Sequence, residues 1–451
     1  MIVEVSPLEG ALLHPIHHVS ALDPTVPTSG GGGRPTLQVV LASVVLALAA
    51  GLAGFAVGRA TEAGAPSSPP WRALPPAPIA ARIAEGVVWT GKEMIVWGGV
   101  TQKAVRPLGP CDRCASDGAA YNPATRTWRT IAPAPAGVEG VGAGGVAWTG
   151  HEMVVWASNS PDGPAGAAAY DPATDSWRRL PAGPLGSREL HASVWTGKEL
   201  LVIGGALGDT QAKPVAAALD PKAGTWRLVS AFDNLFFFGG PSGAVWSGHE
   251  AFVMGSLSLC PEKGSTCTDR RPAFVAYDPA TDKVREIPLP APSTNFGSDT
   301  AASLTPVAWS GTEVVFTAGG TGSLRVMRYN PTLGNWKGVK AGSCHVVADP
   351  KQGHGCRDWR IGPWAPCYAP MNVAWLGDRL VTSCTEDGLQ IFDLATSTWT
   401  WRSLVPGPSP FTTTGGPAVV WTGTDLIVWG SAWGGPGTQT PAVGASLALK
   451  G

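Results

Sequence analysis

Eight cysteines carry the most specific chemistry in this chain of 451 residues. They are Cys111, Cys114, Cys260, Cys267, Cys344, Cys356, Cys367 and Cys384. In an oxidising compartment, an even number of cysteines at such spacings predicts four disulfides. We expect Cys111 to pair with Cys114 and Cys260 with Cys267, while the connectivity of the other four stays open. A redox-active or metal-binding Cys-x-x-Cys is the alternative, although a structural zinc site would need a second close pair.

Five aromatic residues outside the repeat described below form a second candidate set. They are Phe237, Trp359, Trp364, Tyr368 and Trp433. Exposed aromatic rings stack well on sugars and on peptides, because they offer a large apolar area at low entropic cost. The alternative is that they close the small cores of their own loops. We treat them as candidate binding residues for a protein or a glycan.

Sequence motifs for catalysis and for cofactor binding are absent. The chain has no Gly-rich phosphate loop, no G-x-S-x-G and no H-E-x-x-H, so we expect no catalytic residue, no cofactor and no metal. An enzyme would need charged residues that converge on one point, and the candidates are Asp112, Arg113, Asp269, Arg270, Arg271, Arg357 and Asp358. With 32 Lys and Arg against 33 Asp and Glu, the chain lacks the basic excess of a nucleic-acid-binding protein.

An uncharged, apolar stretch near the N-terminus is long enough to cross a membrane. Residues 37–58 are predicted to form a transmembrane helix, because about 20 apolar residues span the hydrocarbon core of a bilayer. We expect residues 1–36 to be a disordered cytosolic tail and residues 59–70 to be a short linker. All eight cysteines follow this stretch, which favours an extracytoplasmic location for the rest of the chain. A cleaved leader is the alternative.

A repeated motif organises the chain after the linker. Trp, then Ser or Thr, then Gly recurs between two apolar runs, which predicts a β-hairpin with a tight turn. The copies begin at Trp89, Trp148, Trp195, Trp246, Trp309 and Trp421, with an altered copy at Trp375. A second signature follows every copy except that at Trp421: an aromatic or apolar residue, Asp or Asn, usually Pro, and in most copies a Trp. Asp-Pro and Asn-Pro start turns, so each unit has four short strands, a to d, with tight a–b and c–d turns.

Four strands at a period of about 50 residues are typical of a β-propeller blade. There are seven a–b hairpins, but no strand d follows the last one. The missing strand is provided at the other end of the chain, where residues 71–74 (WRAL) copy residues 177–180 (WRRL). We therefore predict an all-β fold, a seven-bladed propeller over residues 71–451 whose last blade is closed by the N-terminal strand. The repeated Trp residues should pack between blades, and His151 and His249 should be solvated residues of a–b turns.

The chain resembles the kelch-repeat family of propellers. Kelch blades end strand b with a double Gly, and a double Gly stands here at residues 98–99, 204–205 and 319–320. The other four blades depart from the pattern, at residues 157–158, 255–256, 383–384 and 430–431. The resemblance implies a binding module in most members and an enzyme in a few, such as galactose oxidase. A copper site of that type would need two His and two Tyr, one of them linked to a Cys. Only Tyr368 is not committed to a repeat, and there is no matching His pair.

The two faces of the predicted ring differ. Alternating strand directions place the short a–b and c–d turns on one face and the longer b–c and d–a connections on the other. All eight cysteines and all five candidate aromatics map to the second face, and long loops on a rigid ring are typical of binding sites. We therefore expect a membrane-anchored, extracytoplasmic, kelch-like binding module for a protein or a glycan. The alternative is an extracytoplasmic propeller enzyme that acts on carbohydrate, of oxidase or hydrolase type, with its site on the same face.

Overall fold

The computed structural model describes the chain between residues 72 and 448, and all described residues belong to one compact unit, Ser68–Gly451. Inside that span, the residues outside the description are 84–85, 102–114, 139–144, 158–165, 187–188, 207–214, 234, 236, 260–268, 291–303, 319–324, 340–344, 350–352, 358–371, 386–387, 404–417 and 432–441. Among the described residues, no helix has the length and apolar character needed to span a membrane. The predicted tail 1–36, span 37–58 and linker 59–70 lie outside them.

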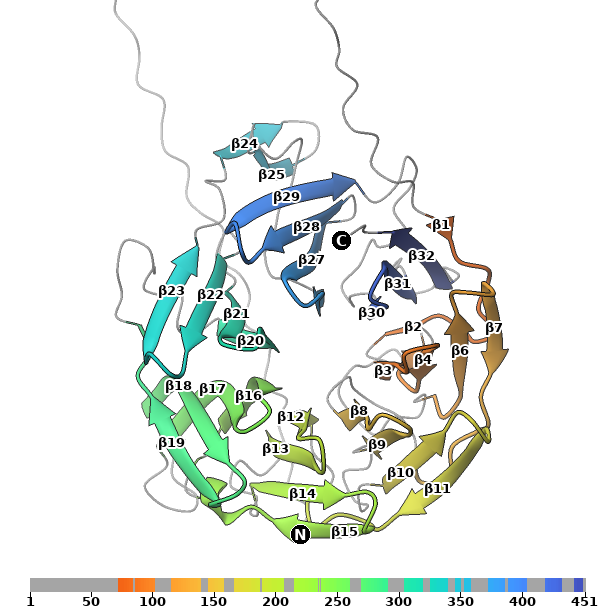
Figure 1. Cartoon of the computed structure of the whole chain (residues 1–451), viewed down its shortest axis with the longest axis horizontal. Helices are drawn as coiled ribbons and strands as arrows, with labels where there is room; N and C mark the ends of the chain where they lie inside the picture. Colours follow the sequence, from red (N-terminus) through yellow and green to blue (C-terminus); the bar gives the residue numbers. More distant parts are fainter. Residues whose placement is uncertain are drawn as a thin grey trace, which may run out of the picture. The chain divides into compact units, whose positions relative to one another are not determined.

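Seven four-stranded antiparallel sheets form a β-propeller (Figure 1), which confirms the all-β fold and the number of blades predicted from the repeat. Blades 1 to 3 are β3 (Gly86–Trp89), β4 (Met94–Trp97), β6 (Gly118–Asn122) and β7 (Thr127–Thr130); β8 (Val146–Trp148), β9 (Met153–Ala157), β10 (Gly166–Asp171) and β11 (Ser176–Leu180); and β12 (Glu189–Trp195), β13 (Leu200–Ala206), β14 (Ala216–Asp220) and β15 (Thr225–Leu228). Blades 4 to 6 are β16 (Phe237–Trp246), β17 (Ala251–Leu259), β18 (Asp269–Asp278) and β19 (Lys283–Ile287); β20 (Leu304–Trp309), β21 (Val314–Ala318), β22 (Arg325–Asn330) and β23 (Asn335–Val339); and β26 (Asn372–Trp375), β27 (Arg379–Thr385), β28 (Gly388–Asp393) and β29 (Thr398–Ser403).

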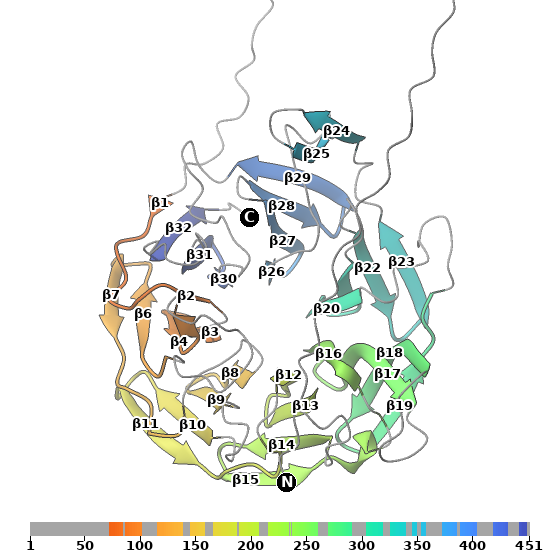
Figure 2. The same cartoon turned by 180° about the vertical axis from the view of Figure 1, so that it is seen from behind.

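Blade 7 joins the two ends of the propeller, as Figure 2 shows from behind. Its strands are β30 (Ala418–Trp421), β31 (Asp425–Ser431), β32 (Ala442–Ala448) and, as the outer strand, β1 (Arg72–Ala73). Arg72 is opposite Ser446 and Ala73 is opposite Ala445. The N–H of Leu74 then donates to the carbonyl of Gly444 at 2.8 Å, as Ile131 does to Gly118 at 3.1 Å in blade 1. The predicted closure by the N-terminal strand is therefore confirmed, although Trp71 itself lies outside the described residues.

Two two-stranded sheets and a 3-10 helix were not predicted from the repeat. β2 (Arg82–Ile83) pairs with β5 (Val100–Thr101), and β24 (His345–Asp349) pairs with β25 (Gly353–Arg357). A short 3-10 helix, η2, spans Ser230–Phe232. All three belong to b–c or d–a connections, where neither turn motif of the repeat occurs.

The hydrophobic core lies between neighbouring blades. Buried residues form seven clusters, one at each of the seven contacts between adjacent sheets. The Trp of strand d also joins two blades, because its indole N–H donates to a carbonyl at the end of the preceding blade. The four such bonds are Trp128 to Pro75 at 3.0 Å, Trp177 to Ala132 at 2.7 Å, Trp226 to Pro181 at 2.9 Å and Trp336 to Pro288 at 2.9 Å. The predicted packing of repeated Trp residues between blades is confirmed at these positions.

Candidate functional site

The strand directions give the propeller two unlike faces. The turn face contains the a–b turns, such as residues 90–93, and the c–d turns, such as residues 123–126. The long-loop face contains the b–c and d–a connections, many of which include residues outside the described ranges. Because β1 is antiparallel to β32, the chain enters the propeller at the turn face, at Arg72.

On the turn face, a Thr or Ser side chain closes most of the a–b turns. In blade 1, Oγ1 of Thr90 accepts a hydrogen bond from the N–H of Glu93 at 2.8 Å and donates to the carbonyl of Glu93 at 3.1 Å. Gly91 between them has a φ of 89°, a conformation that strains any residue with a side chain. His151 and His249 follow the equivalent Gly of their own turns, and both are exposed. The prediction that they are solvated turn residues is therefore confirmed.

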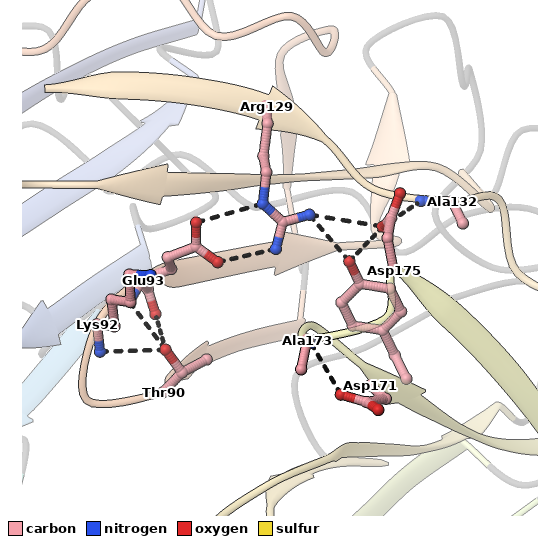
Figure 3. A network of polar contacts seen from close by, with 9 residues as sticks. Thr90, Lys92, Glu93, Arg129, Ala132, Asp171, Ala173 and Asp175 are labelled. Atoms are coloured by element: carbon pink, nitrogen blue, oxygen red, sulfur yellow. Dashed lines mark hydrogen bonds and ion pairs between the residues drawn. The ribbon is translucent and has the colours of Figure 1, made fainter. Parts of the chain in front are cut away.

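Below these turns, a network of charged residues connects blades 1 and 2 (Figure 3). Arg129 of β7 donates through Nη2 and Nε to the carboxylate of Glu93, at 2.8 and 3.2 Å. Its Nη1 donates to the hydroxyl of Tyr170 in the next blade at 3.0 Å, and Tyr170 donates to Asp175 at 2.5 Å. Burial, together with the bond to Asp175, raises the pKa of Tyr170 to about 12, so the phenol remains a donor at neutral pH.

Asp175 completes this network from a strained backbone position. Its φ of 48° lies in the left-handed region, which costs a residue other than Gly about 1 kcal/mol. Its carboxylate accepts from the N–H of Ala132 at 3.0 Å and from Tyr170, and it lies 3.5 Å from Arg129. The contacts that hold Asp175 therefore come from both blades, which makes the network a joint between them.

The same pairing of an acidic residue at the start of strand b with a basic residue on strand d recurs around the turn face. The closest contacts are Arg178 to Glu152 at 2.7 Å, Arg227 to Glu199 at 2.8 Å, Arg285 to Glu250 at 2.8 Å and Lys337 to Glu313 at 3.3 Å. In blade 3, Arg227 also donates to Tyr277 of blade 4 at 3.2 Å. The two partners of each pair lie two strands apart, so no local sequence motif marks them. These ion pairs join strands b and d of the same blade.

Stability should fall in acid because these carboxylates are paired. Hydrogen bonding to Arg178 lowers the pKa of Glu152. Burial alone would raise the pKa of Asp175, but the hydrogen bonds from Tyr170 and Ala132 outweigh burial, so this pKa is also lowered. A lowered pKa in the folded state favours folding above the ordinary pKa, and this advantage is lost as pH falls through the lower value. We expect the urea midpoint to decrease between about pH 5 and pH 3, and to decrease less in Glu152→Gln. An equal acid dependence in that variant would contradict the assignment of Glu152.

On the long-loop face, the b–c pairing is most extended in blade 4. β17 and β18 are joined by nine registered pairs, from Ala251–Tyr277 to Leu259–Asp269, whereas the other described b–c ladders have at most seven. One row across the sheet contains Phe237, Leu257 and Arg271. Nη2 of Arg271 donates to the carboxylate of Glu286 at 2.9 Å. A candidate aromatic and a candidate charge thus come together in one blade, with Asp269 and Arg270 at the start of the same strand.

The other candidate residues are only partly located. Phe237 lies on β16, Cys356 and Arg357 on β25 and Cys384 on β27, each placed by its backbone alone. Trp359, Trp364, Tyr368, Trp433, Asp112, Arg113, Asp358 and the other six cysteines lie outside the described residues. The disulfides and the aromatic surface therefore remain predictions. Within the described ranges, no three His, Cys, Asp or Glu residues form a group that could hold a metal ion.

His191, which no repeat position explains, packs against a buried Trp. It lies on β12, and its ring meets that of Trp156 edge to face, with centroids 4.7 Å apart. A Cβ on Gly145 would lie 3.5 Å from its Nε2. This close packing of a blade 3 ring against blade 2 indicates a structural histidine at this position.

Arg82, which sequence analysis did not single out, is a fully buried cation beneath the long-loop face. Its Nη1 donates to the carbonyl of Gly98 at 3.1 Å and to the carboxylate of Asp117 at 2.7 Å, and its Nε donates to the carbonyl of Ala80 at 2.9 Å. It ties the segment after β1 to the b–c connection of blade 1. No spacing pattern marks it, because these partners are two backbone carbonyls and a single Asp side chain, at separations of 2, 16 and 35 residues along the chain.

Replacing Arg82 with Met should lower the free energy of unfolding by about 2–3 kcal/mol, since a buried carbonyl and a carboxylate lose their donor. Urea unfolding followed by Trp fluorescence measures this loss. Lys222→Met, at an exposed position of a c–d turn, serves as the control and should change stability by less than about 0.5 kcal/mol. Equal stability of the two variants would show that the hydrogen bonds of Arg82 to Gly98 and Asp117 do not stabilise the fold.

Comparison with known proteins assigns no family to this site: no family model matches the chain, and no curated protein is significantly similar to it.

Proposed function

We propose that this chain is a kelch-like propeller that binds a protein or a glycan on its long-loop face. The observation that carries the proposal is the contrast between the two faces. On the turn face, the turns are short and hydroxyl-closed, and the charges beneath them form pairs such as Arg129–Glu93. On the long-loop face, the connections are long and blade 4 extends its strands, which is typical of ligand-binding faces on rigid scaffolds.

The kelch-like part of the proposal is supported by backbone geometry at the double Gly. Gly98 and Gly99 have φ values of 69° and 88°, and Gly204 and Gly205 have 70° and 86°. Positive φ at two successive residues strongly favours Gly, because a side chain would be strained there. Both pairs stand where strand b ends, as in the kelch motif.

We also propose that residues 37–58 anchor the chain in a membrane, with the propeller on the extracytoplasmic side and its eight cysteines in four disulfides. The apolar length of that segment and the position of all cysteines after it support this proposal. The face proposed for binding is not the face at which the chain enters the propeller.

Replacing Trp359 and Trp364 together with Ala should reduce ligand affinity at least about tenfold, because aromatic anchors commonly carry most of the binding energy of an interface. The full-length chain would be tested on a glycan array and by pull-down, and any ligand found would be titrated against both forms. The thermal midpoint should not change.

A matched double variant on the turn face, Lys198→Ala with Lys222→Ala, should bind like the native chain. Loss of binding in this variant but not in the Trp variant would place the ligand on the wrong face for this proposal. Release of an altered sugar or of hydrogen peroxide from a bound glycan would instead favour the carbohydrate-enzyme alternative.

A further inference from the structure

The outer strand of blade 7 is held differently from every other outer strand in the described sheets. In the described part of β1, Arg72 and Ala73 pair with Ser446 and Ala445 of β32. Both of its residues are exposed. It is the only one of these outer strands that no c–d turn joins to its own strand c. β1 can therefore leave β32 without any change in a turn.

The site that receives β1 is a specific slot for an extended segment, formed by blades 7 and 1. The carbonyl of Ala73 accepts from Nη2 of Arg126 at 2.8 Å, and the carbonyl of Pro75 accepts from Nε1 of Trp128 at 3.0 Å. Leu74 is only 8% exposed and packs with residues of both blades. A Cβ on Gly444 would lie 2.7 Å from its Cδ1, so Gly444 leaves the space that Leu74 fills. We call these contacts the blade 7–blade 1 slot.

The segment after the slot is suited to act as a hinge. Residues 76–78 read Pro-Ala-Pro, and Pro76 and Pro78 are exposed. Proline keeps such a segment extended and gives it no N–H with which to continue the β32 ladder. Beyond the hinge, Ile79 is buried and Arg82 is fixed by Gly98 and Asp117. Only residues 72–75 are therefore free to dock elsewhere while the rest of the propeller stays folded.

We propose that β1 exchanges between copies of this chain, so that residues 72–75 of one copy occupy the blade 7–blade 1 slot of a second copy. A second copy is the occupant that the contacts favour, because it carries the same extended segment, with its small residue, Leu and Pro at the same spacing. Exchange leaves the number of hydrogen bonds and the buried Leu unchanged, so it is a low-cost route to a dimer. Exchange also keeps the edge of β32 covered by a strand. An uncovered edge would pair with unrelated strands of other molecules. The inference does not depend on the ligand proposed above.

Cysteine exchange between two differently tagged full-length chains tests this proposal. One chain carries Arg72→Cys and the other Ser446→Cys, positions that are directly opposed in the register of β1 and β32. Directly opposed residues of an antiparallel pair are close enough for a disulfide. After mixing and mild oxidation, we expect a covalent heterodimer in which mass spectrometry identifies the bridge between positions 72 and 446. A single chain with both substitutions should form the same bridge.

Two controls separate exchange from random collision. Lys222→Cys in place of Arg72→Cys presents an equally exposed thiol that has no slot, and its yield of heterodimer should be at least tenfold lower. Leu74→Asp added to the Arg72→Cys chain should abolish the heterodimer, because the slot excludes a carboxylate. Equal yields from positions 72 and 222, or a bridge that forms only within the single doubly substituted chain, would overturn the proposal. If neither bridge forms, unmodified tagged copies that fail to co-purify after mixing would also overturn it.

Discussion

Leu74→Asp is expected to lower the free energy of unfolding by about 4 kcal/mol, since it removes a buried aliphatic side chain and places a carboxylate in an apolar slot. Leu74 packs with Ile79, Trp429 and Val420, so its loss affects the contact between the first and last blades. The expected effect is large because this contact closes the propeller. Urea unfolding measured by Trp fluorescence and by circular dichroism gives the change.

Arg72→Asp is the matched control for this prediction. Arg72 is exposed and lies two residues from Leu74, so an Asp side chain placed there should alter stability by less than about 0.5 kcal/mol. A Leu74→Asp variant as stable as Arg72→Asp would mean that residue 74 is not part of the core. The closure would then be a weak surface contact.

Gly166→Ala should destabilise the protein by about 3 kcal/mol, at the upper end of what overpacking costs. A Cβ at Gly166 would lie 2.1 Å from the carbonyl oxygen of Gly137, which belongs to the connection between blades 1 and 2. A backbone oxygen cannot move away by changing rotamer, so the strand and the connection must separate. The thermal midpoint should decrease, and the change in free energy should be read from urea unfolding.

Ala substitutions at two other glycines show whether the loss of stability in Gly166→Ala comes from a steric clash or from backbone conformation. Gly186 has no neighbour within 4 Å of an added Cβ and no left-handed φ, so Gly186→Ala should be neutral or stabilising by up to about 1 kcal/mol. Gly91 also has open space but a φ of 89°, and Gly91→Ala should cost about 1 kcal/mol. If Gly166→Ala proved no worse than Gly91→Ala, the close approach of the two blades would be contradicted.

The fold could be predicted from sequence because each of its turns has a local chemical requirement. A Gly at positive φ, as at Gly91, stands at the same position of all seven a–b turns, and a Thr or Ser hydroxyl that bonds to the backbone, as at Thr90, stands at a fixed position in six of them. Because these residues recur, the start of each of the seven repeats could be recognised in the sequence. Closure followed from counting, because one strand d was missing at one end and present at the other.

The interactions that join blades could not be predicted in the same way. Glu93 directly precedes β4 and Arg129 lies on β7, 36 residues along the chain. Only the pairing of β4, β6 and β7 brings the two side chains together. Arg82 finds its partners 16 and 35 residues away without any repeated spacing. The candidate ligand surface was predicted from the mapping of loops to one face, and the structure adds to it the row of Phe237, Leu257 and Arg271 in blade 4.

The most direct test of the closed ring is a disulfide between β1 and β32 in the full-length chain. Ala73→Cys with Ala445→Cys joins two directly opposed positions, and mild oxidation should form this bridge in high yield and raise the thermal midpoint. Ala73→Cys with Ala448→Cys, three residues out of register, should not form one. A bridge to position 448 but not to position 445, or no bridge in either variant, would contradict the register on which the closed seven-bladed ring depends.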